Sequence, residues 1–188
     1  MIEPDIIYTA ETYYNSLLNG KKVICVDFDN TVCLDEWPYI GPLIPESIKV
    51  LKELQSNDHK LIFYTQRTRN YPICCNALEE FVRKNPDKIT YRYEGVFPIK
   101  TVDIYSDAIK VLVDNGINIW DENRNFKWEN LTNDFSRKLF ADYFIDDHNV
   151  GMKYVIIRNK FGEECKVCDW NYIDDYFVSE GLYKNKVL

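Results

Sequence analysis

Glycine and histidine are scarce in this 188-residue chain, and their scarcity excludes several kinds of site. Only seven glycines are present and no two form a Gly-x-Gly pair, which argues against a dinucleotide-binding loop. Gly20-Lys21-Lys22 lacks both the upstream glycine and the Ser or Thr of a Walker loop. The two histidines, His59 and His148, are too few for a His-based metal site or a Ser-His-Asp triad.

Long apolar runs and a basic surplus are also missing. No stretch approaches the roughly 18 consecutive apolar residues of a membrane span. The first five residues show no secretory signal, so we expect a cytoplasmic protein. The formal net charge of −7 argues against a nonspecific nucleic-acid binder, because neutralising phosphates needs a basic face. An acidic protein that handles phosphate needs a metal or a few well-placed cations.

The six cysteines fit reduced thiols better than a disulfide framework, because no secretion signal is visible. Cys165 and Cys168 have the spacing of a metal-ligand pair, but no second pair is spaced in the same way. The adjacent Cys74 and Cys75 would be awkward partners. Free thiols are therefore favoured over a zinc site.

Short apolar runs alternate with helical patterns along the chain, which predicts an α/β domain with a mainly parallel sheet. The expected strands are residues 23–26, 61–64, 117–120, 144–145 and 154–157. The expected helices lie near residues 11–19, 45–54, 76–83 and 106–115, with a last one capped by Asp169. Residues 35–45 are rich in turn formers. Residues 68–105 contain no strong strand pattern and are expected to be an insert within the single domain.

Four polar features occur at the carboxyl ends of expected strands, the edge at which open α/β sheets bind ligands, or, for Lys138, just ahead of a strand. They are Asp27 with Asp29, Thr65, Lys138, and the pair Asp146-Asp147. A carboxylate at a strand end can attack phosphorus, and a second one two residues later can protonate the leaving oxygen and then activate water. A Thr hydroxyl and a Lys can orient and neutralise a phosphoryl group. Asp27 and the acidic pair supply the oxygen ligands that Mg²⁺ prefers.

Each feature alone has an ordinary explanation as a solvated loop, a cap or a surface charge. Their joint order along the chain is what favours a site. A receiver domain combines similar residues, but there the acidic pair precedes the phosphoacceptor, which is the opposite order to this chain.

This order resembles the haloacid dehalogenase (HAD) superfamily, and most closely its small phage-type members without a large cap. The resemblance lies in three stretches: residues 25–31, 38–45 and 136–151. It implies a Rossmann-like core of about five parallel strands in the order 5-4-1-2-3, with flanking helices. Asn30 stands where the superfamily often has Gly, which is tolerable because Asn accepts left-handed backbone.

The resemblance also assigns roles to individual residues. It makes Asp27 the nucleophile, Asp29 the general acid and base, Thr65 the second-motif hydroxyl and Lys138 the third-motif cation. It implies Mg²⁺ held by Asp27, by the backbone carbonyl of the second aspartate and by an aspartate of the fourth motif; the metal ligands expected here are Asp27, Asp29, Asp146 and Asp147.

Four neighbouring residues are expected to contact substrate: Asn30, Thr31, Gln66 and Arg67. Arg67 is close enough in sequence to Thr65 to meet a phosphate, although a surface ion pair explains it equally well. Trp37 can stack on a base or a sugar, or simply pack. The insert contains six basic and five acidic residues, a charge of +1 that would suit a lid over a phosphate.

The sequence therefore predicts a Mg²⁺-dependent phosphatase that acts on a small soluble phosphomonoester through an aspartyl-phosphate, with a nucleotide or a sugar phosphate as possible substrates. Asp29 favours ester hydrolysis over dehalogenation, because an alkoxide leaving group needs an acid. Two alternatives remain: a non-catalytic binding or scaffold protein with the same fold, and a phosphatase of nucleic-acid ends. Neither a membrane nor nucleic acid is the expected partner.

Overall fold

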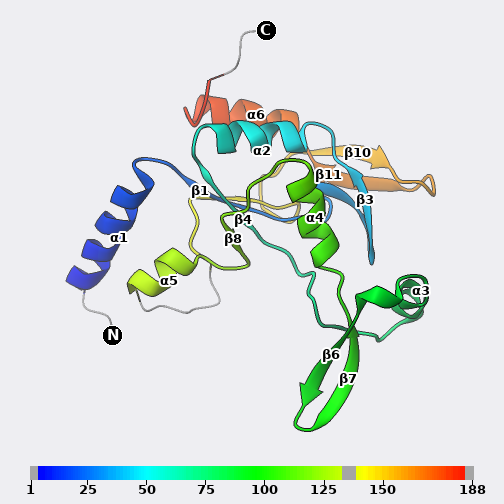
Figure 1. The fold of residues 1–188 in the computed structure, drawn as a ribbon. Helices are drawn as coiled ribbons and strands as arrows, with labels where there is room; N and C mark the ends of the chain where they lie inside the picture. The colour runs from blue at the N-terminus through cyan, green and yellow to red at the C-terminus, as the bar shows by residue number, and fades with distance from the viewer. Residues whose placement is uncertain (1–3, 133–138, 185–188) are drawn as a thin grey trace.

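The computed structural model describes residues 4–132 and 139–184 as a mixed α/β structure (Figure 1). Its centre is a four-stranded parallel sheet in the order β8-β4-β1-β9. The strands are β1 Val23–Val26, β4 Lys60–Phe63, β8 Asp121–Glu122 and β9 Tyr143–Ile145. The predicted α/β class with a parallel sheet is therefore confirmed.

Helices cover both faces of this sheet, and the side chains of β1 show why. Ile24 and Val26 contribute to one buried cluster, whereas Val23 and Cys25 contribute to another on the opposite face. All four are buried, as expected for a central strand of a parallel sheet. The first cluster packs against α2 Ser47–Ser56, α4 Ser106–Asp114 and α6 Trp170–Ser179, and the second against α1 Pro4–Leu18 and α5 Phe126–Thr132.

Two of the five predicted strands are placed differently. Residues 117–120 are not a strand: the backbone N–H of Ile117 donates to the carbonyl oxygen of Leu112 at the end of α4, and contact with β4 begins where the backbone N–H of Trp120 donates to Leu61, just before β8. The predicted fifth strand is β10 Tyr154–Arg158, which does not join the sheet. It pairs antiparallel with β11 Glu164–Cys168 instead, because the chain reverses at Gly162 (φ 82°) and the two neighbouring segments pair locally.

The predicted turn-rich stretch contains a hairpin of β2 Cys33–Glu36 and β3 Tyr39–Leu43. Gly41 is required in it, since a Cβ at this position would lie 2.2 Å from the carbonyl oxygen of Leu34. No helix among the described residues is long and apolar enough to cross a bilayer.

Residues 68–105 hold strands, contrary to expectation. They comprise β5 Tyr71–Pro72, α3 Asn76–Lys84, the 3-10 turn η1 Pro86–Lys88, β6 Ile89–Glu94 and β7 Phe97–Val102. The strands form an antiparallel sheet in the order β5-β7-β6, with a buried cluster of its own around Leu78, Phe81 and Ile104. Figure 1 shows the β6–β7 hairpin projecting away from the parallel sheet.

We predict that Ile24→Ala lowers the free energy of unfolding by about 2–5 kcal/mol, because it leaves a cavity in the core. Ile24 has an exposed fraction of 0%. Leu17→Ala is the matched control: Leu17 is 49% exposed, and its loss is expected to change stability by less than about 0.5 kcal/mol. Urea unfolding measures the free energy of unfolding of both variants, and equal losses would contradict the burial of β1 in the core.

Candidate active site

The register of the parallel sheet brings the predicted site residues to one edge. Val26 pairs with Phe63 on one side and with Ile145 on the other, so β1, β4 and β9 end at the same level. The ladder continues one step further, where the amide of Asp27 donates to the carbonyl oxygen of Ile145 at 2.9 Å. Asp27 and Asp146 therefore follow adjacent strands at the carboxyl edge of the sheet, where ligands bind in folds of this class.

A cavity of about 400 Å³ opens at this edge. Most of the predicted site residues line it, namely Asp27, Asp29, Asn30, Thr65, Gln66, Arg67, Asp146 and Asp147. The structure adds Asp35, Tyr64, Tyr71 and His148 to the lining, and it also places there Trp37, which the sequence suggested could stack on a substrate or simply pack. Lys138 lies outside the described residues.

Asp27 is a carboxyl group in an unfavourable position for a charge. Burial is the main cause that raises its pKa to about 7, and the nearby charges of Asp146, Asp29 and Asp147 raise it further, against the lowering effect of the backbone N–H of Phe28. A cation bound among these carboxylates would reverse that shift.

Asp29 is held by Arg67 in a two-pronged ion pair. The guanidinium donates from Nη2 to Oδ1 at 2.7 Å and from Nε to Oδ2 at 2.9 Å. Arg67 is 3% exposed, and its remaining donors reach the carbonyl oxygens of Pro38, Tyr39 and Ile104. Burial raises the pKa of Asp29 even though Arg67 opposes the rise.

Arg67 was predicted to bind substrate, and its geometry argues for another role. Its guanidinium is fully engaged with Asp29 and with the backbone carbonyls of two other segments. Such a group positions the carboxylate of Asp29 and ties the β2–β3 turn to the end of the insert at Ile104. A substrate phosphate would have to displace these contacts.

Thr31 also has a supporting position. It is fully buried, and its hydroxyl oxygen accepts the amide of Asp147 at 3.1 Å and lies 3.4 Å from Oδ2 of Asp27. The expectation that Thr31 contacts substrate does not fit this burial. Its hydroxyl instead joins the loop after β1 to the loop after β9.

The β4 end is anchored by a residue that the sequence did not indicate. The side-chain oxygen of Asn123 accepts a hydrogen bond from the backbone N–H of Thr65 at 2.8 Å. The backbone N–H of Asn123 donates to the carbonyl oxygen of Phe63. Thr65 in turn accepts the amide of Arg67 at 3.2 Å. No pattern in the sequence indicated Asn123, because its partner is 58 residues away.

Asn30 has φ 54°, the left-handed backbone that was expected for it.

The acidic pair after β9 forms a cluster with His148. Ligand atoms of Asp146, Asp147 and His148 all lie within 4.8 Å of one another. Nδ1 of His148 is 2.7 Å from Oδ1 of Asp147, and this hydrogen bond raises the pKa of His148. Burial raises the pKa of Asp147. Together with Asp27 these carboxylates form an oxygen-rich donor set suited to a hard cation such as Mg²⁺.

The insert contributes little to the cavity. Tyr71 at its start is the part of residues 68–105 that lines the site. The exposed residues of the β6–β7 hairpin, Tyr93 and Phe97 among them, are absent from the lining. In this structure the hairpin therefore does not cover the site, and a lid role stays a prediction.

The Cys165–Cys168 pair does not form a metal site in the structure. Both residues lie on β11 three positions apart, and side chains at such positions point to opposite faces of a strand. All six cysteines are free thiols.

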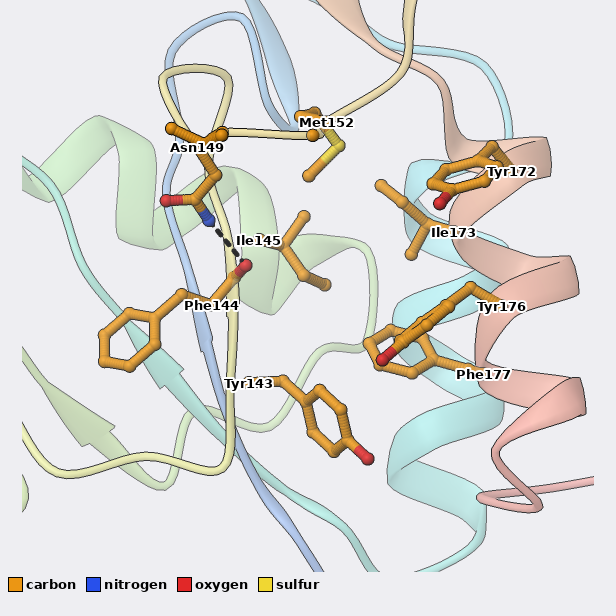
Figure 2. A pocket seen from close by; sticks show the side chains of 11 residues that line it. Tyr143, Phe144, Ile145, Asn149, Met152, Tyr172, Ile173, Tyr176 and Phe177 are labelled. Carbon is orange, nitrogen blue, oxygen red and sulfur yellow. Dashed lines mark hydrogen bonds between the residues drawn. The ribbon is translucent and has the colours of Figure 1, made fainter.

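A second pocket, of about 340 Å³, lies between β9 and α6 (Figure 2). Its walls combine aromatic and aliphatic side chains, and the labelled side chains of Tyr143, Tyr176 and Phe177 gather on one side of it. Asn149 donates its amide to the carbonyl oxygen of Phe144 at 2.7 Å. None of the predicted site residues lines this pocket, and no charged side chain does.

We predict that Asp27→Asn stabilises the metal-free protein above neutral pH. A carboxyl group whose pKa is raised on folding stabilises the fold below its unfolded pKa of 3.8, and this contribution is lost as the pH rises through about 7. At pH 8 the variant should therefore melt at least about 3 °C above wild type, with the gap closing toward pH 4. A constant gap across this range, measured by circular dichroism in EDTA, would refute the shift.

We also predict that Arg67→Met lowers the free energy of unfolding by about 3 kcal/mol, because it leaves the partly buried Asp29 carboxylate unpaired and removes the donors of three backbone carbonyls. Arg69→Met is the control, since Arg69 pairs with Glu122 at the surface with 57% of its side chain exposed. Its loss should cost less than about 1 kcal/mol. Denaturant unfolding measures the free energy of unfolding of both variants. Equal losses of stability would show that the pair of Arg67 and Asp29 contributes no more than the surface pair of Arg69 and Glu122.

Comparisons with known proteins add support for the fold. No family model matches the chain, and no curated protein matches it. Among solved structures it is similar to a conserved protein from Bacteroides thetaiotaomicron, with 27% identity, a TM-score of 0.53, and coverage of 86% of this chain and 92% of that one. The description of that protein names no activity, so the likeness bears on architecture and leaves the chemistry to be argued from the cavity.

Proposed function

We propose that this protein is a HAD-type phosphohydrolase that cleaves small phosphomonoesters with Mg²⁺ through an aspartyl-phosphate on Asp27. One observation carries the proposal: three segments far apart in the sequence place Asp27 with Asp29, Thr65, and Asp146 around a single cavity at the carboxyl edge of the sheet. An acidic protein has little reason to crowd carboxylates around a cavity unless a cation joins them.

Mg²⁺ fits the residues present. Asp27, Asp146 and Asp147 offer carboxylate oxygens, and the pKa of Asp27 is raised first by burial and then by the neighbouring negative charges, which a divalent cation would neutralise. When bound, the ion supplies charge neutralisation of the phosphoryl group and lets an anionic nucleophile approach it.

Asp27 attacks phosphorus in this mechanism. Its carboxylate lines the cavity, and its backbone is fixed by the ladder bond to Ile145. The attack forms an O–P bond to Asp27 and breaks the bond from phosphorus to the leaving alcohol. Water then cleaves the aspartyl-phosphate and regenerates the carboxylate.

Asp29 moves the proton in both steps. It donates a proton to the leaving alkoxide and afterwards accepts one from the attacking water. Both of its oxygens contact Arg67, so a proton on either oxygen replaces one of these hydrogen bonds. Burial favours the protonated form, and Arg67 keeps the carboxyl group in place between the two steps.

The remaining groups orient the phosphoryl oxygens. The Thr65 hydroxyl lines the cavity next to the exposed Gln66, and both can donate to a phosphoryl oxygen. Lys138 would supply a fixed positive charge, the role that the HAD resemblance assigns to it. The free thiols support the proposal of a cytoplasmic, reducing setting.

Two alternatives make different demands on the site. A binding or scaffold protein with this fold would not need Asp27 and Asp29 together in an open cavity. A phosphatase of nucleic-acid ends would need cations for the next phosphates, whereas Asp35 and His148 occupy the described rim. A small-molecule ester fits better than either.

We predict phosphate release from p-nitrophenyl phosphate that depends on Mg²⁺ and stops with EDTA. Asp27→Asn should abolish turnover because it removes the nucleophile, and Asp29→Asn should reduce kcat by about 10²–10⁴-fold because it removes the proton donor. Asp175→Asn, on the exposed face of α6, is the control and should match wild type.

Retained activity in Asp27→Asn would exclude the covalent mechanism. Binding of Mg²⁺ without turnover of any ester in a broad panel would favour the non-catalytic alternative.

A further inference from the structure

We propose that the alcohol released by this enzyme carries a positively charged ammonium group, as in phosphorylated amino alcohols such as phosphocholine. This inference rests on the proposed phosphatase function and specifies its substrate class. It comes from the part of the cavity that lies outside the catalytic carboxylates.

Three aromatic side chains line the cavity beside the carboxylates. Trp37 comes from the β2–β3 turn, Tyr64 directly follows β4, and Tyr71 lies on β5 of the insert. The rings of Trp37 and Tyr71 meet edge to face, with centroids 5.6 Å apart and an angle of 63°. Tyr64 is 40% exposed. Trp37 and Tyr71 also pack against the buried cluster of the insert, and an organic cation in the cavity is attracted to any ring face that it meets by the negative potential of the π-system.

A carboxylate stands beside this aromatic wall. Asp35 is exposed at the rim of the cavity, and its Oδ1 accepts the backbone N–H of Trp37 at 3.0 Å. The bond ties Asp35 to the turn that carries the indole ring. An ammonium group in front of Trp37 would therefore lie near a negative charge as well as aromatic faces.

The described cations of the cavity have partners of their own. Arg67 is bound by Asp29 and by three backbone carbonyls, and His148 is hydrogen-bonded to Asp147. A second anionic group on the substrate would find neither of them available. This argues against bisphosphates and nucleic-acid ends.

The surface next to the cavity continues the same negative charge. An adjoining pocket shares Asp35, Asp147 and His148 with the site and adds Glu163 and Glu164, of which Glu164 is paired with Arg158 at 2.6 Å. Lys166 also lines this pocket, and its Nζ lies 3.8 Å from the ring centroid of Tyr154. A cationic substrate would be attracted along this approach, whereas a substrate with an extra anionic group would be repelled.

The deciding experiment compares phosphocholine with 3,3-dimethylbutyl phosphate, which has the same shape without the positive charge. We expect kcat/KM to be about tenfold higher for phosphocholine with wild-type protein and Mg²⁺, as a desolvated cation–π contact allows. Adenosine monophosphate and glucose 6-phosphate complete the panel and represent an aromatic and a neutral polar leaving group.

Two variants localise the effect. Asp35→Asn keeps the oxygen that accepts the Trp37 amide but loses the charge, and Tyr64→Leu removes a half-exposed ring. Each should reduce the preference for phosphocholine over its neutral analogue by about threefold or more. Tyr172→Leu is the matched control, because Tyr172 is 41% exposed on α6 and should leave the preference unchanged.

The two proposals fail in different ways. Turnover of p-nitrophenyl phosphate with equal or better use of the neutral analogue, or a preference for adenosine monophosphate, would overturn the cationic substrate and leave the phosphatase intact. If no ester is hydrolysed, calorimetric titration with choline and with 3,3-dimethylbutanol still decides, since the proposal requires tighter binding of choline. Equal or weaker choline binding would overturn it.

Discussion

The level ending of three parallel strands is the constraint on which the candidate site depends. Because Val26 pairs with Phe63 and with Ile145, the chain leaves β1, β4 and β9 at one edge of the sheet. Hydrogen bonds across these strands hold that alignment, and a slip of one residue would turn alternate side chains to the wrong face of the sheet. Asp27 and Asp146 are brought together by backbone pairing before any side chain contributes.

The ion pair between the buried Arg67 and Asp29 connects the loops around the cavity. Arg67 follows β4, Asp29 follows β1, and the remaining guanidinium donors reach the β2–β3 turn and the end of the insert. A buried guanidinium is tolerated only when its donors are satisfied, so these segments are held together as one unit. The contact with the carbonyl oxygen of Pro38 holds the turn that carries Trp37 close to Asp29.

Crowded negative charge gives the cavity its chemical character. The pKa of Asp27 is raised to about 7, so without a cation this carboxyl group is partly protonated near neutral pH and is a poor nucleophile. A cation among the carboxylates would restore the charged form. Outside the catalytic carboxylates, Asp35 and Glu163 extend the negative potential toward solvent. A substrate with a positively charged group is attracted by this potential.

The sequence by itself determined the α/β class, the central strand at residues 23–26, and the positions at which Asp27 and Asp146 follow their strands, because apolar runs and the polar residues that end them are local signals. It placed Thr65 directly after its strand, whereas β4 ends at Phe63. Only the tertiary structure decided that β10 pairs with β11 instead of extending the sheet, that Arg67 is committed to Asp29, and that Thr31 is buried. It also revealed the anchoring role of Asn123 and the aromatic wall of Trp37, Tyr64 and Tyr71. These features depend on partners far apart in the chain, and strand pairing, burial and the use of hydrogen-bond donors are set by distances in space that no local pattern records.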